Sequence, residues 1–143
     1  MKRCVLSIFI LLLILLPFEL QAQGIKNQCL ICGMDLNQYT HVRYQVTDNK
    51  GNIFTTCGVQ CGLILQLNLK DTFKSATATD LFSHRTIPAS KAWFVYHSSI
   101  ITDMGPGFIA FANRDTAQRF IKGFGGELLN YQSSLQKIKN GLE

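Results

Sequence analysis

The pattern of apolar and polar residues predicts a first unit of two strands, a helix and a third strand. Residues 41–46 alternate between the two kinds, as a half-buried strand does, and residues 53–55 begin a second strand after a polar turn. The period then lengthens to that of a helix, which Thr56 is placed to cap. The apolar stripe of this helix consists of Val59, Leu63, Ile64 and Leu67. Residues 73–78 predict a weak third strand.

The same order of elements is predicted again in the second half of the chain. Residues 92–96 and 108–111 read as strands on either side of a Gly/Pro turn, and Asn113 is placed to cap a helix. The apolar stripe of that helix consists of Ala117, Phe120, Ile121 and Phe124. Two glycines end it, and residues 127–131 return as a short strand. We therefore expect an α+β fold of two ββαβ repeats, which share one core because neither half alone buries enough apolar surface.

The first 22 residues have the features of a secretory signal peptide. Lys2 and Arg3 precede an apolar run at residues 5–18, which is shorter than the roughly 20 residues that a membrane-spanning helix needs. A small-residue cleavage site precedes Gln23. The sequence thus predicts a secreted, extracytoplasmic or periplasmic protein, with an uncleaved N-terminal anchor as the alternative.

Composition limits the remaining possibilities. The 143 residues are 47% hydrophobic and 16% charged, which excludes disorder as the main state. The formal net charge is +5, but Lys and Arg are scattered, so we expect no nucleic-acid partner. Four parts are predicted: the signal peptide (1–22), the first ββαβ repeat with a cysteine knuckle (23–85), the second repeat (86–131) and a polar C-terminal tail (132–143), expected to be a frayed helix.

Cysteine spacing provides the clearest chemical signal. Cys4 lies in the signal peptide, and the remaining cysteines form a Cys-x2-Cys pair and a Cys-x3-Cys pair, namely Cys29, Cys32, Cys57 and Cys61. The second pair begins a predicted helix, whose positive end lowers thiol pKa values and favours thiolates. Four such sulfurs can hold Zn(II), and they suit the softer Cu(I) even better. Disulfides are the alternative in an oxidising compartment, with Cys29–Cys32 expected to form first, and a thioredoxin-like redox motif is a further one.

Two methionines favour copper over zinc. Met34 follows the first cysteine pair directly, and Met104 lies in the Gly/Pro turn of the second repeat. Thioethers bind Cu(I) and hardly bind Zn(II), although packing alone can also explain either residue. His97 is retained as a possible nitrogen ligand because it is the histidine closest in sequence to Met104.

Together these features resemble the NosL family over residues 27–131, and residues 29–69 alone also resemble YHS and TRASH-type metal modules. The features that carry the resemblance, in chain order, are Cys29-x2-Cys32-Gly33-Met34, the Cys57/Cys61 segment, Met104-Gly105 before the apolar strand 108–111, and Phe120 before Gly125-Gly126. The resemblance implies a copper-binding accessory protein of nitrous oxide reductase, outside the cytoplasm, with two ββαβ units. It also implies one Cu(I) bound by cysteine and methionine sulfur, with Cys29, Cys32, Met34 and Met104 at the positions of the family's motif.

We expect the chain to bind Cu(I) and pass it to a client cuproenzyme or its maturation complex, without catalysing a reaction. Membrane contact is expected only if the signal segment remains uncleaved. Two other functions remain open: a structural zinc module that supports protein interactions, and a thiol–disulfide oxidoreductase.

Overall fold

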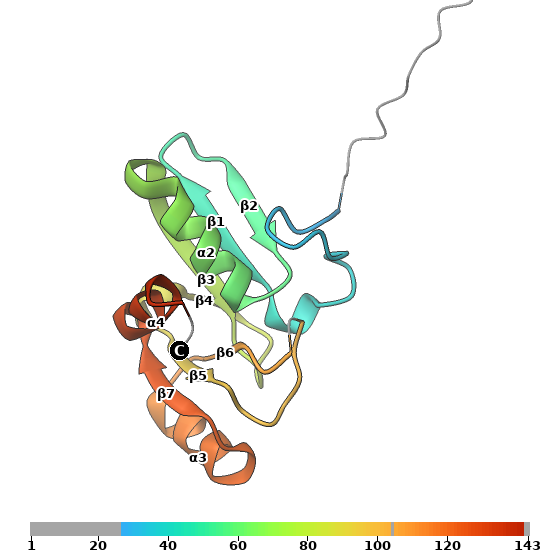
Figure 1. Ribbon diagram of the computed structural model, residues 1–143, viewed down its shortest axis with the longest axis vertical. Coiled ribbons are helices and arrows are strands. Elements are labelled where there is room, and N and C mark those ends of the chain that lie inside the picture. The colour runs from blue at the N-terminus through green and yellow to red at the C-terminus, as the bar shows by residue number, and fades with distance from the viewer. Residues whose placement is uncertain (1–26, 104, 142–143) are drawn as a thin grey trace, which may run out of the picture.

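The computed structural model describes residues 27–103 and 105–141, and its first unit has the predicted order of elements (Figure 1). The elements are β1 (Tyr44–Asp48), β2 (Ile53–Thr56), α2 (Val59–Leu69), β3 (Phe73–Thr79) and β4 (Thr86–Pro88). The four strands form one antiparallel sheet in the order β2-β1-β3-β4. The first strand of the unit is therefore central, with its hairpin partner β2 on one side and β3 on the other.

The second unit repeats this topology. Its elements are β5 (Trp93–Tyr96), β6 (Phe108–Phe111), α3 (Arg114–Phe124) and β7 (Glu127–Asn130), followed by α4 (Tyr131–Lys139). The strand order is β6-β5-β7, so the first strand is again central and all pairs are antiparallel. The α+β fold of two ββαβ repeats is thus confirmed.

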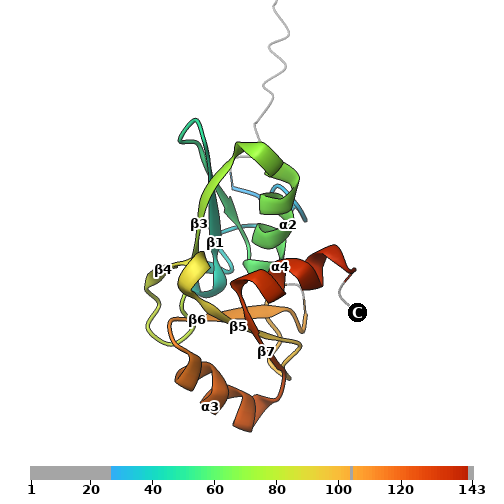
Figure 2. The same cartoon turned by 90° about the vertical axis from the view of Figure 1, so that its left-hand side faces the viewer.

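The two repeats share one hydrophobic core, as expected. Tyr44 of β1 and Leu63 of α2 belong to the same buried cluster as Phe94 of β5 and Phe108 of β6. A second cluster, which includes Phe111 and residues of α3, covers the other face of the second sheet. Figure 2 shows this sheet between α3 and the first unit. Burial on both faces explains why β6 is a continuous apolar run rather than an alternating one.

Two local predictions were wrong. The first strand begins at Tyr44, and His41 lies in a short 3-10 helix (Thr40–Val42) that precedes it. Thr56 does not cap α2, whose N-cap is Gly58 in extended conformation. The Thr56 hydroxyl instead donates to the backbone oxygens of Gly58 and Tyr44, at 2.9 and 3.2 Å, and so ties the end of β2 to the start of the helix.

Three segments form more regular secondary structure than the sequence predicts, because tertiary contacts stabilise them. The expected weak strand β3 has seven residues and pairs on both sides, with β1 and with the unpredicted strand β4. Most of the expected polar tail forms α4, which the Asn130 side chain caps by accepting from the Ser133 backbone N–H at 2.9 Å. Leu135 and Ile138 of this helix pack against the shared core.

The predicted signal peptide lies outside the described residues. Within the part of the chain that the structure describes, none of the helices is both long enough and apolar enough to cross a bilayer.

Candidate metal centre

The first cysteine pair lies in a tight knuckle at the start of the described chain. The backbone N–H of Cys29 donates to Met34 at 2.8 Å, and that of Gly33 donates back to Cys29 at 2.8 Å. Gly33 has a φ of 77°, which a residue with a side chain rarely adopts, so the glycine allows the turn to close. The guanidinium group of Arg43 donates to the Leu36 carbonyl at 2.6 Å and attaches the knuckle to the start of β1.

The second cysteine pair lies where β2 passes into α2. Cys57 immediately precedes the N-cap, and Cys61 lies in the first turn of the helix. Both side chains are fully buried, and they pack with buried Cys29 and the partly buried Cys32 and Met34. The strand-to-helix junction therefore forms one wall of the site and the knuckle forms the other.

The four cysteine sulfurs converge on one point. The Sγ atoms of Cys29, Cys32, Cys57 and Cys61 all lie within 4.8 Å of one another. The Cys32–Cys57 distance is 3.4 Å and the Cys57–Cys61 distance is 3.7 Å. A tetrahedral ion with metal–sulfur bonds of about 2.3 Å separates its sulfurs by about 3.8 Å. The donor set and its spacing therefore fit a soft or borderline metal ion.

The thiols differ in acidity. Burial raises the pKa of Cys29, but backbone N–H donors, first that of Cys57, outweigh it and bring the pKa to about 7. Burial, followed by the hydrogen bond to Asp103, raises the pKa of Cys57 far above its ordinary value. Burial and the nearby Cys29 sulfur also raise the pKa of Cys61, so the expectation that the helix start lowers the pKa of this pair is wrong. A metal ion that binds all four sulfurs must therefore displace protons from the buried pair.

Asp103 belongs to the site although the sequence analysis did not identify it. Its buried carboxylate accepts a hydrogen bond from the Cys57 thiol at 3.0 Å, and it lies where a side chain on Gly58 would point. The β5–β6 loop of the second repeat thus reaches the cysteines of the first. The only sequence signal for this residue is its position next to Met104.

The sequence profile of the NosL family matches residues 20–137. The chain belongs to the NosL family. The match includes both repeats and all four converging cysteines.

Two relatives extend this result. The crystal structure of the copper chaperone NosL from Shewanella denitrificans matches with a TM-score of 0.61 and 26% identity, and the match covers 78% of this chain and 93% of that one. The HTH-type transcriptional repressor CutR of Bacillus subtilis (strain 168) is 27% identical over 113 residues, which are 78% of this chain and 58% of the repressor. This chain therefore spans less than two thirds of that relative. The family and the solved chaperone agree with the expectation that the chain is not an enzyme.

Met34, Met104 and His97, the other predicted ligands of this NosL protein, differ in what the structure describes of them. Met34 is partly buried and packs against the cysteine cluster. Met104 lies outside the described residues, although its neighbour Asp103 contacts Cys57. Among the described residues, the group that could hold a metal contains no histidine, and His97 is exposed at the end of β5.

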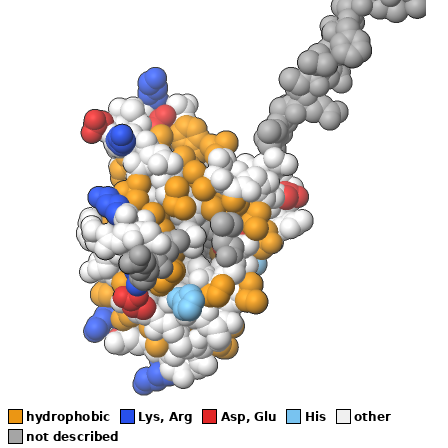
Figure 3. Space-filling view, viewed as in Figure 1, with side chains coloured by type: hydrophobic (Ala, Val, Ile, Leu, Met, Phe, Trp, Pro, Cys, Tyr) orange, Lys and Arg blue, Asp and Glu red, His pale blue; other side chains and the backbone are white. Residues whose placement is uncertain are grey.

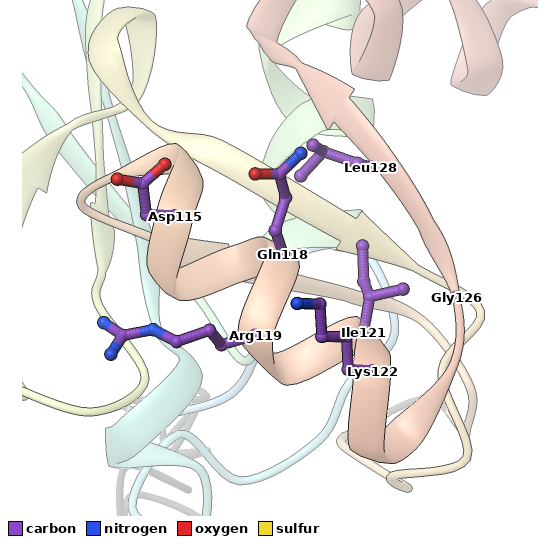
Figure 4. A pocket seen from close by; sticks show the side chains of 7 residues that line it. All are labelled: Asp115, Gln118, Arg119, Ile121, Lys122, Gly126 and Leu128. Atoms are coloured by element: carbon purple, nitrogen blue, oxygen red, sulfur yellow. The ribbon is translucent and has the colours of Figure 1, made fainter.

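A separate groove lies between α3 and β7, at the end of the second repeat (Figure 4). Its volume is about 630 Å³, and it is lined by Asp115, Gln118, Arg119, Ile121, Lys122, Gly126 and Leu128. No cysteine or methionine lines it, so it offers nothing to a soft metal ion.

The contact of Asp103 with Gly58 and Cys57 leads to a stability prediction. Gly58→Ala places a methyl group on the Asp103 carboxylate, and Asp103→Ala leaves the buried Cys57 thiol with only the weaker sulfur acceptors of Cys32 and Cys61. Each change should cost about 1 kcal/mol in the free energy of unfolding. The double variant should cost less than the sum by about 0.5 kcal/mol or more, because removing the carboxylate also removes the steric overlap. Urea denaturation of the reduced, metal-free proteins measures this cycle, and strict additivity would contradict the contact.

Proposed function

We propose that this NosL protein is an extracytoplasmic, periplasmic Cu(I)-binding accessory protein that delivers copper to a cuproenzyme such as nitrous oxide reductase. The observation that carries the proposal is the convergence of four cysteine sulfurs within 4.8 Å of one another. Membership of the family and the similarity to a copper chaperone support copper as the cargo.

The proposed ligands are the four cysteines and the two methionines, namely Cys29, Cys32, Met34, Cys57, Cys61 and Met104. Thiolates and thioethers are soft donors, which favours the Cu(I) state over Cu(II). Met34 packs on the cluster, and Asp103, the sequence neighbour of Met104, contacts Cys57.

Exposure of the cysteines suggests how the ion leaves. Cys32 is the partly exposed cysteine, whereas the other three are buried. A ligand of the client would therefore reach the ion beside Cys32 and displace that sulfur first. Such an exchange changes only the ligands of the ion and needs no redox step.

Zinc is the alternative that the donor set also supports, since four cysteine sulfurs at this spacing suit a closed Zn(II) site. The oxidoreductase alternative has less support, because the Cys-x2-Cys pair lies in a hairpin-like knuckle rather than at the start of a helix.

Metal titration tests the proposed function. The reduced protein should take up about one Cu(I) in competition with a chromogenic chelator, and bind Zn(II) more weakly. Met34→Leu keeps the apolar volume and removes the thioether. The change should weaken Cu(I) binding by roughly tenfold, which is the lower end of the loss in affinity seen when residues around a metal site are replaced. Zn(II) binding should not change. Tighter binding of zinc than of copper would overturn the proposal.

A further inference from the structure

Two strongly exposed aliphatic side chains lie on the two segments that contact Cys57, the cysteine knuckle and the β5–β6 loop. Leu30 is 65% exposed and lies in the knuckle, two residues before Cys32. Ile101 is 77% exposed and lies two residues before Asp103, whose carboxylate contacts Cys57. Both segments contact Cys57: the Cys32 sulfur lies 3.4 Å from the Cys57 sulfur, and the Asp103 carboxylate lies 3.0 Å from it. We call Leu30 and Ile101 the rim.

The rim carries no charge, in contrast to the rest of the protein. Residues 27–34 and 97–102 contain no Lys, Arg, Asp or Glu, although the chain has a formal net charge of +5. Figure 3 shows hydrophobic side chains across the middle of one face of the protein, with Lys and Arg mainly at the margins of the view. A partner that binds over Cys32 therefore meets apolar surface rather than a basic patch.

We propose that the rim is the docking surface for the copper acceptor, and that the acceptor presents an apolar surface around its own copper ligand instead of an acidic one. This inference rests on the proposed function, because it names the kind of partner that the same site serves. Water must leave the space beside Cys32 when an incoming ligand replaces that sulfur, and aliphatic side chains release it readily. Leu30 is two residues from the partly exposed Cys32, and Ile101 is two residues from Asp103, so in this proposal an acceptor that reaches the Cys32 sulfur also covers the rim.

Uncharged docking has a kinetic signature. Association that depends on opposite charges slows steeply as salt screens them, whereas apolar association does not. Copper transfer from this protein should therefore be nearly independent of ionic strength despite its basic character.

The test uses two Cu(I) chelators as acceptors of defined chemistry: neocuproine, which is neutral and apolar, and bathocuproine disulfonate, which is anionic. Leu30→Ser and Ile101→Ser should each slow transfer to neocuproine by up to roughly tenfold, as expected for the loss of one buried aliphatic contact. Their equilibrium affinity for Cu(I) should not change, because neither residue is a ligand. Ile53→Ser is the matched control, since Ile53 is also 65% exposed but begins β2, at the end of that strand away from Cys57.

The outcomes separate the two proposals. If the wild-type protein takes up no Cu(I), the proposed function fails and the rim inference fails with it. If copper binds but the rim variants transfer it to neocuproine as fast as Ile53→Ser does, the rim inference alone is overturned. It is also overturned if the anionic chelator takes copper much faster than neocuproine at low salt and added salt removes that difference. A concentration-dependent dimer that Leu30→Ser abolishes, measured by sedimentation, would assign the rim to a second copy of the chain and would also overturn it.

Discussion

Oxidation of the reduced, metal-free protein by glutathione disulfide is expected to join Cys32 to Cys57 and to abolish copper binding. Their Sγ atoms are 3.4 Å apart, and Cys32 is the cysteine that a soluble oxidant can reach. The Cys32 thiolate would attack glutathione disulfide and release one glutathione. The Cys57 thiol, whose proton the hydrogen-bonded Asp103 carboxylate can accept, would then attack the mixed disulfide and release the second. Two cysteine thiols are thereby oxidised and one glutathione disulfide is reduced.

The geometry favours a different pair from the one that the sequence predicts. The spacing of Cys29 and Cys32 predicts closure within the knuckle, whereas the 3.4 Å contact links the knuckle to the strand-to-helix junction. Either bridge removes two thiolates and should eliminate binding, because a disulfide offers no thiolate to the metal. Peptide mapping by mass spectrometry locates the bridge, and copper titration before and after reduction measures the loss. A Cys29–Cys32 bridge would contradict the pairing, and undiminished copper binding would contradict the ligand set.

The second large effect is expected from Gly62→Ala, which should destabilise the fold by about 2 kcal/mol. A methyl group at this position of α2 would overlap the ring of Tyr44, with the Tyr44 Cβ only 2.7 Å away. Tyr44 cannot move aside easily, because it is fully buried and its hydroxyl donates to Gln66 at 3.0 Å. Overpacking of this kind costs typically 1–3 kcal/mol, more than the roughly 1 kcal/mol that alanine gains over glycine in a helix.

Gly123→Ala is the matched control for this prediction. Gly123 also lies in a helix, α3, but a methyl group there would meet no atom within 4 Å. The control should therefore stabilise the protein by roughly 0.5–1 kcal/mol through helix propensity alone. Urea denaturation of both variants gives the two free energies, and equal stabilisation would show that α2 does not pack closely on Tyr44.

Local sequence patterns were sufficient for most of the architecture. The alternation before the first turn, the helix from Val59 and the capping position of Asn113 each depend on neighbouring residues, and all appear in the structure. The predicted apolar stripe of the first helix is only half right, because Val59 and Leu63 are buried, whereas Ile64 and Leu67 are partly exposed and Leu65 is buried instead. The Asn113 side chain accepts from the backbone N–H of Thr116 at 2.9 Å, as its position predicts. Signals of this kind are local, so one sequence suffices to find them.

What the sequence did not reveal depends on distant contacts. Strand β4 has only three residues and ends in proline, so its pairing with β3 leaves no periodic pattern. Asp103 is a single acidic residue in a loop, and its role follows from folding of the second repeat against α2. Cysteine spacing predicted a site of four sulfurs, but the burial of three cysteines and the partial exposure of Cys32 required the packed structure.

Because the cysteine pairs are far apart along the chain, binding of the metal ion should also stabilise the folded protein. Cys32 and Cys57 are 25 positions apart, so one ion bound to both closes the intervening segment, which contains the first hairpin, into a loop, as a covalent cross-link would. The bound ion stabilises the folded state relative to the unfolded chain, so the metal-loaded protein should resist heat and proteases better than the metal-free protein. Degradation would then fall mainly on molecules that carry no metal, and the population of carriers would adjust itself to the supply of copper.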